Sequence, residues 1–185
     1  MKKVFSMIIV WLAVLLLLSC ATDRRFVYLA DGKKFFILPP EFSETPMEVY
    51  QRITGKFHER SFVFNSYVKS DSESIYIEFF NDLGASAGSM SYDGENFDFY
   101  SPYLPPAARG EYMLADMQLV LYPWSRISEE LESDGFRCEH EISGDTEIRR
   151  IYDCDTQIMV ITRNGNSVSL VNKIRGYSYM IEEQR

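Results

Sequence analysis

The stretch Ser101–Phe136, "SPYLPPAARGEYMLADMQLVLYPWSRISEELESDGF", interrupts a chain of short strand-like segments, and this interruption decides the fold class. Prolines at positions 102, 105 and 106 exclude a central strand here. From Glu111 onward the apolar residues follow a helical spacing, so we predict an amphipathic helix. Its apolar stripe consists of Met113, Leu114, Met117, Val120 and Leu121.

A second helix is predicted immediately after the first. Pro123 interrupts the first helix and suits the first turn of the next one. Trp124, Ile127 and Leu131 then recur on one side, and Gly135 is a suitable residue just beyond the end. The stretch therefore predicts two consecutive helices in the middle of the chain.

The segments on both sides of these helices read as strands joined by tight turns. Asp31-Gly32, Asp93-Gly94 and Asn164-Gly165 are favoured two-residue hairpin turns. Alternating apolar residues occur in "SFVFNSYVKS" and "SIYIEFF", as expected for half-buried strands. We predict a mainly β (α+β) fold, a strongly curved and unclosed antiparallel β-barrel whose two central helices cover the concave face.

The amino terminus, "MKKVFSMIIVWLAVLLLLSC", has the features of a secretory signal: two lysines, an apolar run and a small residue before a cleavage site. Leu17-Leu18-Ser19-Cys20 resembles the bacterial lipobox, which implies acyl chains on Cys20. Two or three such chains give lasting membrane attachment. Ala21 rather than Asp follows the cysteine, which in enterobacteria-like systems implies export to the outer membrane.

These features divide the chain into a signal peptide (residues 1–19), a lipidated tether (residues 20–25) and a single domain (residues 26–185). Removing the signal takes away two lysines and no acidic residue, so the formal charge falls from −8 to −10. This acidic balance argues against nucleic acid as a partner and against a polybasic contact with anionic lipid. We expect a periplasm-facing protein held at the outer membrane by its amino-terminal lipid.

The motif Gly84-Ala85-Ser86-Ala87-Gly88 has the G-x-S-x-G pattern of hydrolase nucleophiles. A nucleophile elbow requires a strand, a turn and then a helix, but here strand-like residues flank both sides. His140, the one histidine downstream, lies in the alternating segment "RCEHEI" between two glutamates. We therefore interpret Ser86 as part of a strand-to-strand loop, and we expect no catalytic residue and no enzyme activity.

Metal or disulfide chemistry would have to use the remaining histidines and cysteines of the chain. His58, His140, Cys138 and Cys154 lack the spacing of metal ligands, so no metal site is predicted. Cys138 and Cys154 flank a predicted hairpin around residues 143–145, and an exported protein can oxidise such a pair. The two cysteines would lie directly opposite each other only if the hairpin were centred near Thr146. The sequence leaves a Cys138–Cys154 disulfide and two separate thiols as alternatives.

Several stretches resemble an uncharacterised family of bacterial lipoproteins: "QRITGKF", "FFNDLGASAGSMSYDG", "SPYLPP", "YMLADMQLVLYP" and "RGYSYMIE". That family is typically encoded beside aryl-polyene biosynthesis genes. It is itself similar to LolA/LolB-type lipoprotein carriers, in which an unclosed barrel capped by helices encloses an apolar cavity for acyl chains. Asn81-Asp82 stands where such carriers often have proline, so this part of the resemblance is partial. No cofactor is predicted, since the sequence contains no Gly-rich phosphate loop.

An outer-membrane-anchored binder or carrier of an apolar ligand is the leading functional hypothesis, with an acyl chain, a lipoprotein or an aryl-polyene lipid as cargo. Such a protein needs a dry concave surface with adaptable walls. The candidate ligand-binding residues on the sheet are Phe62, Phe64, Ile77, Phe79, Met90 and Phe99, and those on the helices are Leu114, Met117, Leu121 and Trp124.

Two alternatives remain open. The candidate residues can simply fill a packed core, because apolar faces normally close against one another. A non-catalytic scaffold that docks envelope or biosynthetic proteins at the membrane would instead need an exposed apolar patch. The sequence identifies no protein partner.

Overall fold

The fold is built around one long, curved antiparallel sheet. A computed structural model describes residues 24–102 and 109–184 of the 185-residue chain. Within them, in chain order, lie β1 (Phe26–Ala30), β2 (Lys33–Phe36), the short 3-10 helix η1 (Pro40–Phe42), β3 (Met47–Phe57), β4 (Arg60–Ser70), β5 (Ile75–Phe80), β6 (Ser86–Tyr92), β7 (Phe97–Tyr100), α2 (Gly110–Leu121), α3 (Trp124–Ser133), β8 (Phe136–Ser143), β9 (Thr146–Asp153), β10 (Thr156–Asn164), β11 (Ser167–Asn172) and β12 (Tyr177–Gln184).

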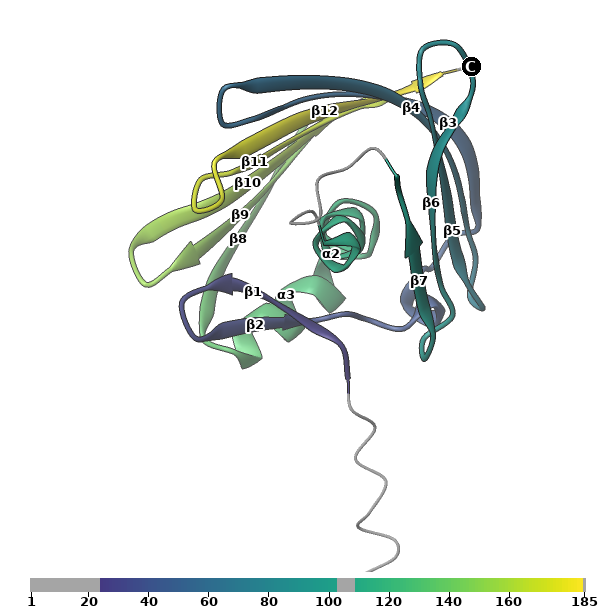
Figure 1. The fold of residues 1–185 in the computed structure, drawn as a ribbon. Helices are drawn as coiled ribbons and strands as arrows, with labels where there is room; N and C mark the ends of the chain where they lie inside the picture. Colours follow the sequence, from purple (N-terminus) through teal and green to yellow (C-terminus); the bar gives the residue numbers. More distant parts are fainter. Residues whose placement is uncertain (1–23, 103–108, 185) are drawn as a thin grey trace, which may run out of the picture.

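Two meanders form the ten-stranded sheet, one on each side of the helices in the sequence. The strand order is β7-β6-β5-β4-β3-β12-β11-β10-β9-β8, so hairpin neighbours pair within each half and β3 pairs with β12 between the halves. The edge strands β7 and β8 do not pair with each other. Figure 1 shows the resulting open barrel, which confirms the predicted fold class.

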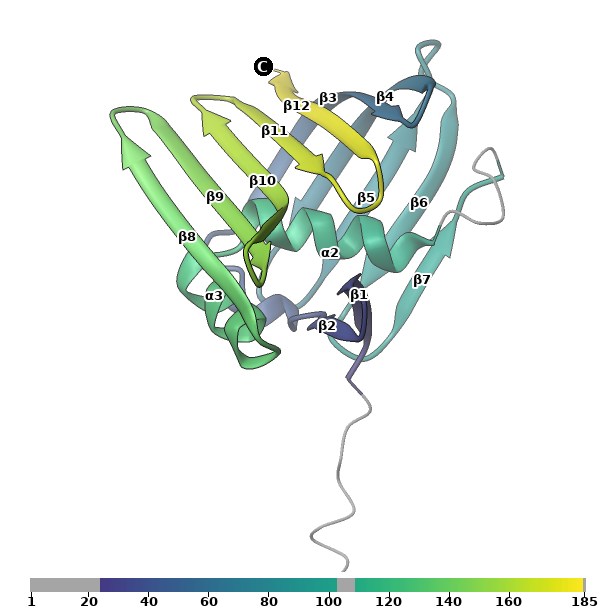
Figure 2. The ribbon, with the colours of Figure 1, turned by 90° about the vertical axis from the view of Figure 1, so that its left-hand side faces the viewer.

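The helices and the separate β1–β2 hairpin close the open side. α2 lies inside the curve of the sheet, while α3 and the hairpin lie between the two edge strands (Figure 1). Figure 2 shows α2 crossing the strands on the concave side. The side chain of Gln118 on α2 accepts a hydrogen bond from the Leu38 backbone N–H at 2.9 Å and donates to the Leu38 carbonyl at 2.7 Å. This contact joins α2 to the segment after β2.

The observed helices agree with the sequence pattern. Pro123 separates them, and the chain leaves α3 through Gly135, whose φ of +82° suits glycine. Ile127 and Leu131 of α3 are fully buried, since this helix packs against β8 and β2. Both helices therefore cover apolar surface that an unclosed sheet leaves open.

Candidate functional site

The side chains on the concave face are fixed by the strand register. Alternate residues point to opposite faces, and cross-strand partners share a face. Phe64 of β4 is paired with Ile53 of β3, which is paired with Ile181 of β12. In the other half-sheet, Arg149 is paired with Ile161, which is paired with Leu170. The concave face is therefore largely apolar, with charged residues toward the β8–β10 edge.

The ten predicted ligand-binding residues fall into two groups. Ile77, Phe79, Met90 and Leu114 are buried, with exposed fractions of at most 6%. They belong to the packed core of the described structure, as the core-filling alternative expects. The remaining six are half-buried: Phe62, Phe64, Phe99, Met117, Leu121 and Trp124.

Half-buried apolar residues form a stripe on α2 and a matching set on the sheet. Met113, Met117 and Leu121 follow Gly110 at helical spacing, and a side-chain carbon at Gly110 would lie 2.4 Å from Phe99 of β7. The stripe therefore faces the half-sheet that contains β4 and β7. We call the apolar lining the residues Ile53, Phe62, Phe64, Phe99, Met113, Met117, Leu121 and Ile181.

Aromatic contacts order the sheet part of this lining. The rings of Phe62 and Phe64 stack with centroids 5.7 Å apart, and Phe64 meets Phe79 edge-on at 5.4 Å. Phe62 also lies over its cross-strand partner Gly55, where any added side-chain carbon would lie 2.2 Å from the ring. Gly55 therefore makes room for an aromatic ring on the concave face. Ile53 and Ile181 are lining residues that the sequence pattern does not predict, because the pairing of β3 with β12 is not visible in the sequence.

A buried carboxyl lies beside the apolar lining. Asp116 of α2 is 5% exposed, and its Oδ2 accepts a hydrogen bond from the Tyr177 hydroxyl at 2.6 Å. Burial raises the pKa of this carboxyl to about 7, although the Tyr177 and Tyr179 hydroxyls and the charge of Arg175 act in the opposite direction. Burial, reinforced by the Asp116 charge, raises the pKa of Tyr177 and Tyr179 above the ordinary tyrosine value.

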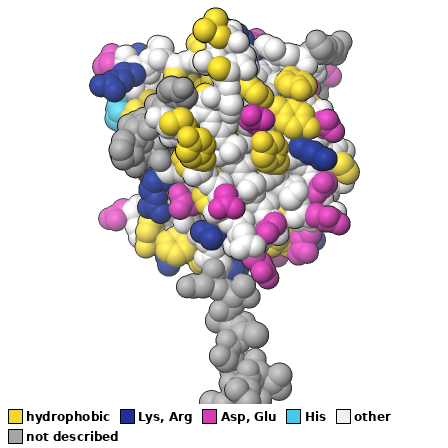
Figure 3. Space-filling model, turned by 45° about the vertical axis from the view of Figure 1, so that its right-hand side comes forward, with side chains coloured by type: hydrophobic (Ala, Val, Ile, Leu, Met, Phe, Trp, Pro, Cys, Tyr) yellow, Lys and Arg dark blue, Asp and Glu magenta, His cyan; other side chains and the backbone are white. Residues whose placement is uncertain are grey.

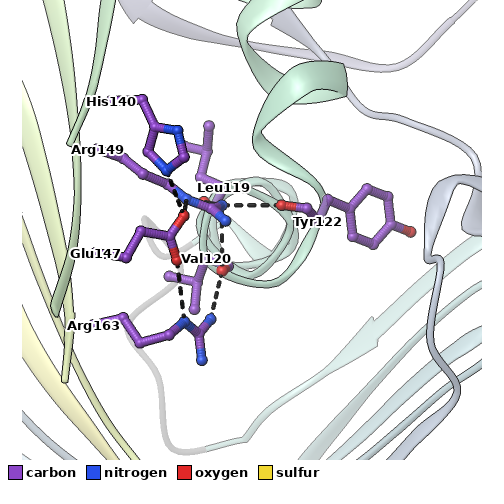
Figure 4. Close-up of polar contacts among 7 residues, drawn as sticks. All are labelled: Leu119, Val120, Tyr122, His140, Glu147, Arg149 and Arg163. Atoms are coloured by element: carbon purple, nitrogen blue, oxygen red, sulfur yellow. Dashed lines mark hydrogen bonds and ion pairs between the residues drawn. The ribbon is translucent and has the colours of Figure 1, made fainter. Parts of the chain in front are cut away.

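The carboxyl end of α2 is held by an arginine cluster, defined as Arg149, Arg163, Glu147 and His140 (Figure 4). The Arg149 Nη1 donates to the carbonyls of Leu119 at 2.8 Å and Tyr122 at 3.0 Å. The Arg163 Nη2 donates to the Val120 carbonyl at 2.8 Å. These cations satisfy carbonyls that have no partner within the helix, at the negative end of its dipole.

Glu147 supplies the counter-charge of this cluster. Its Oε1 accepts from the Arg149 Nε at 2.7 Å and lies 3.0 Å from the His140 Nε2, and its Oε2 lies 3.6 Å from the Arg163 Nε (Figure 4). Burial raises the pKa of the Glu147 carboxyl, but Arg149, His140 and Arg163 together bring that pKa below its ordinary value. Trp124 lies beside this cluster, 5.6 Å from the His140 ring. Trp124, which was predicted to bind the ligand, therefore lies among charged groups and not in the apolar lining.

Ser86 is the exposed first residue of β6, after a turn that follows β5. The Asn81 side chain organises this turn by accepting hydrogen bonds from the backbone N–H groups of Leu83 and Ala85, both at 3.0 Å. The motif therefore forms the predicted strand–turn–strand unit. His140, the other residue of the rejected hydrolase interpretation, lies in the arginine cluster at the opposite edge of the sheet.

Among the described residues, Cys138 and Cys154 are both free thiols. The β8–β9 hairpin turns at residues 144 and 145. For Cys138 and Cys154 to lie directly opposite each other, the turn would have to be centred at Thr146. Cys138 is therefore paired with Ile151, and Cys154 lies three residues further along the chain, at the next turn. Three residues of strand span about 10 Å, which exceeds the separation that a disulfide tolerates. Burial raises the pKa of the Cys138 thiol to about 12.

A shallow surface depression of about 210 Å³ lies at the end of β11 and β12, apart from the apolar lining. Lys56, His58, Lys173 and Ser178 contribute polar side chains to it. Lys173 already donates to Gln157, and both lysines are exposed. Among the described residues, no cluster of three or more His, Cys, Asp or Glu is arranged to hold a metal ion.

Comparison with known proteins places the chain in a family. A family model described as "Protein of unknown function (DUF3261)" matches residues 48–185, so the chain belongs to this family. No curated protein matches. A solved structure of a DUF1329 family protein from Desulfovibrio piger is similar at 8% identity and a TM-score of 0.26, covering 79% of this chain and 87% of that one. Within residues 24–102 and 109–184, no helix is long and apolar enough to cross a membrane.

Proposed function

We propose that this protein is an outer-membrane-anchored, periplasm-facing lipoprotein that binds or carries an apolar ligand on the concave side of its sheet. The observation that carries this proposal is the apolar lining, whose side chains face inward but remain half-buried. A core packed only for stability would bury them further, because exposing apolar surface to water costs about 25 cal/mol per Å². The ligand would be an acyl chain, the lipid part of a lipoprotein or an aryl-polyene lipid.

The two walls of the lining suit such a ligand for different reasons. The sheet wall offers rigid aromatic rings, including the stacked Phe62 and Phe64. The helix wall offers Met113 and Met117, whose unbranched and polarisable side chains adapt to ligands of different shape. The arginine cluster and Gln118 hold α2 in place, so adaptation to the shape of a ligand would come from these flexible side chains.

Docking of other proteins remains the second candidate. Tyr50 and Tyr76 on the convex face are 59% and 37% exposed, and Tyr67 between them lies 5.1 Å from the Tyr50 ring. On the face that Figure 3 shows, however, apolar side chains form separate groups among acidic ones. Crosslinking followed by pull-down would recover the protein partner of a scaffold. Mass spectrometry of lipid extracted from the purified protein would instead detect the ligand of a carrier.

Replacing Met117 with tryptophan is expected to weaken binding of a fluorescent fatty-acid or polyene probe by about tenfold. In the proposed binding mode the larger ring would take up volume that the ligand needs between α2 and the sheet, and a tenfold loss of affinity corresponds to about 1.4 kcal/mol. Probe fluorescence titrated with delipidated protein measures the affinity. Val63→Trp is the matched control, because Val63 is 40% exposed and lies on the convex face of β4. Delipidated wild-type protein that binds no such probe would remove the basis of the proposal.

Cys20→Ala is expected to release the protein from the membrane fraction or leave it unprocessed, since the acyl chains attach at this residue. Cys20 lies outside the described residues, as do the signal peptide and most of the tether, so the anchor rests on the sequence motif. Fractionation of cells followed by immunoblotting measures the change. Cys154→Ala provides a control at an exposed cysteine. The anchor proposal fails if the Cys20 variant stays firmly in the outer-membrane fraction at its mature size.

A further inference from the structure

Two polar side chains lie within the apolar concave face. Ser66 of β4 is fully buried, and Gln51 of β3 is 6% exposed. The two residues are cross-strand partners, and Ser66 is also paired with the buried Phe79 of β5. Beside them on the same face lie the apolar residues Ile53, Phe64 and Val68. Gln51 and Ser66 therefore form a small polar site next to the apolar lining.

Within residues 24–102 and 109–184, the Ser66 hydroxyl has no hydrogen-bond partner. A buried hydroxyl without a partner costs free energy, because it gives up its hydrogen bonds to water on folding. Alanine or valine would fill the same position on a strand without that cost. An unsatisfied group next to a partly buried apolar surface therefore indicates a partner that the protein alone does not provide.

We propose that Ser66 and Gln51 form a polar subsite for one uncharged hydrogen-bonding group, an ester or amide carbonyl, of an otherwise apolar ligand. This inference rests on the proposed function and specifies which apolar molecules the site prefers. The serine hydroxyl and the glutamine amide N–H groups both donate hydrogen bonds, so a carbonyl oxygen can accept from either or both. Such a site selects strongly for ligands that contain a carbonyl group, because a ligand without one leaves the serine and glutamine donors unpaired.

The surrounding charges favour a neutral group over a free carboxylate. Glu183 of β12 is the other cross-strand partner of Gln51, so an acidic side chain borders the subsite on the same face. On α2, Asp116 is a further acidic group of the concave side, and Arg175 is a cation whose charge acts on it. The arginine cluster lies toward the opposite edge of the sheet, on β8–β10. A fatty-acid carboxylate bound at Gln51 and Ser66 would therefore lie beside Glu183, whereas an acyl ester or amide avoids that repulsion.

Photolabelling of the purified, membrane-extracted full chain tests this subsite. Three probes share one alkyl chain with a diazirine: the methyl ester, the free carboxylate and the hydrocarbon. We expect the ester to label peptides of β3 and β4 about tenfold more efficiently than the hydrocarbon, with the carboxylate well below the ester. Ser66→Ala and Gln51→Leu are each expected to abolish the preference for the ester over the hydrocarbon. Ser61→Ala, at an exposed serine on the convex face of β4, is the matched control.

The possible outcomes test the polar subsite and the proposed binding of an apolar ligand separately. Equal labelling by ester and hydrocarbon in the wild type would overturn the subsite while leaving an apolar binding site. Unchanged ester preference in Ser66→Ala and Gln51→Leu would also overturn it. If none of the three probes labels the concave side, the proposed function fails as well. Near-ultraviolet circular dichroism of each variant confirms that its fold is retained, so a loss of labelling reports on the subsite.

Discussion

Arg149→Met is expected to lower the free energy of unfolding by about 3–5 kcal/mol, because it removes one partner of a largely buried ion pair. Arg149 is 7% exposed, and it donates to two carbonyls at the end of α2 as well as to Glu147. Methionine preserves the apolar stem of the side chain and leaves the carbonyls of Leu119 and Tyr122 without this donor. Urea unfolding followed by circular dichroism measures the loss.

Arg150→Met is the matched control for this substitution. Arg150 is the next residue on β9 and points to the opposite face, where it pairs with a half-exposed Glu141. An exposed ion pair of this kind contributes less than about 1 kcal/mol to the free energy of unfolding. Equal destabilisation by the two substitutions would show that the arginine cluster does not hold α2. A loss confined to Arg149→Met, together with easier proteolysis near residue 122, would support that role.

Asp116→Asn is expected to remove a pH dependence of stability that the wild type shows between about pH 4 and pH 7. The folded-state pKa of Asp116 is raised to about 7 by burial, whereas the unfolded chain ionises near the ordinary value of 3.8. The folded protein therefore binds one more proton than the unfolded chain across this interval. The stabilisation is fully present below the unfolded pKa and is lost as the pH rises through the folded pKa.

The size of this effect follows from the difference between the two pKa values. From pH 5 to pH 8 the wild type is expected to lose about 3 kcal/mol of unfolding free energy that Asp116→Asn retains. The asparagine oxygen can still accept the hydrogen bond from Tyr177, so the contact between α2 and β12 persists. Urea unfolding at several pH values measures both curves. Parallel curves for the two proteins would contradict the burial of an ionisable Asp116 carboxyl.

Local patterns in the sequence were sufficient to predict the arrangement of elements. The shift to helical spacing after Glu111, and Pro123 between the helices, predicted α2 and α3. Tight-turn dipeptides predicted consecutive antiparallel pairing on both sides of the helices. These features depend on residues close together in the chain, whose backbone preferences act locally.

The candidate site was predicted only in part. Phe62, Phe64, Phe99, Met117 and Leu121 were chosen from alternation and helical spacing, and they do belong to the half-buried lining. The same patterns also chose Ile77, Phe79, Met90 and Leu114, which are core residues. Periodicity identifies the apolar side of an element, but it does not show how closely the opposite wall approaches.

The sequence by itself determined the signal and lipobox pattern, the acidic charge, the two helices and the alternating strands, because each is set by neighbouring residues. Tertiary structure alone decided that β3 pairs with β12, that Arg149 meets the end of α2, that Asp116 is buried beside Tyr177 and that Cys138 lies opposite Ile151. Each of these contacts joins residues far apart in the chain or depends on where a hairpin turns. The pairing of distant strands sets these distances, and burial of the apolar core residues contributes free energy to that pairing.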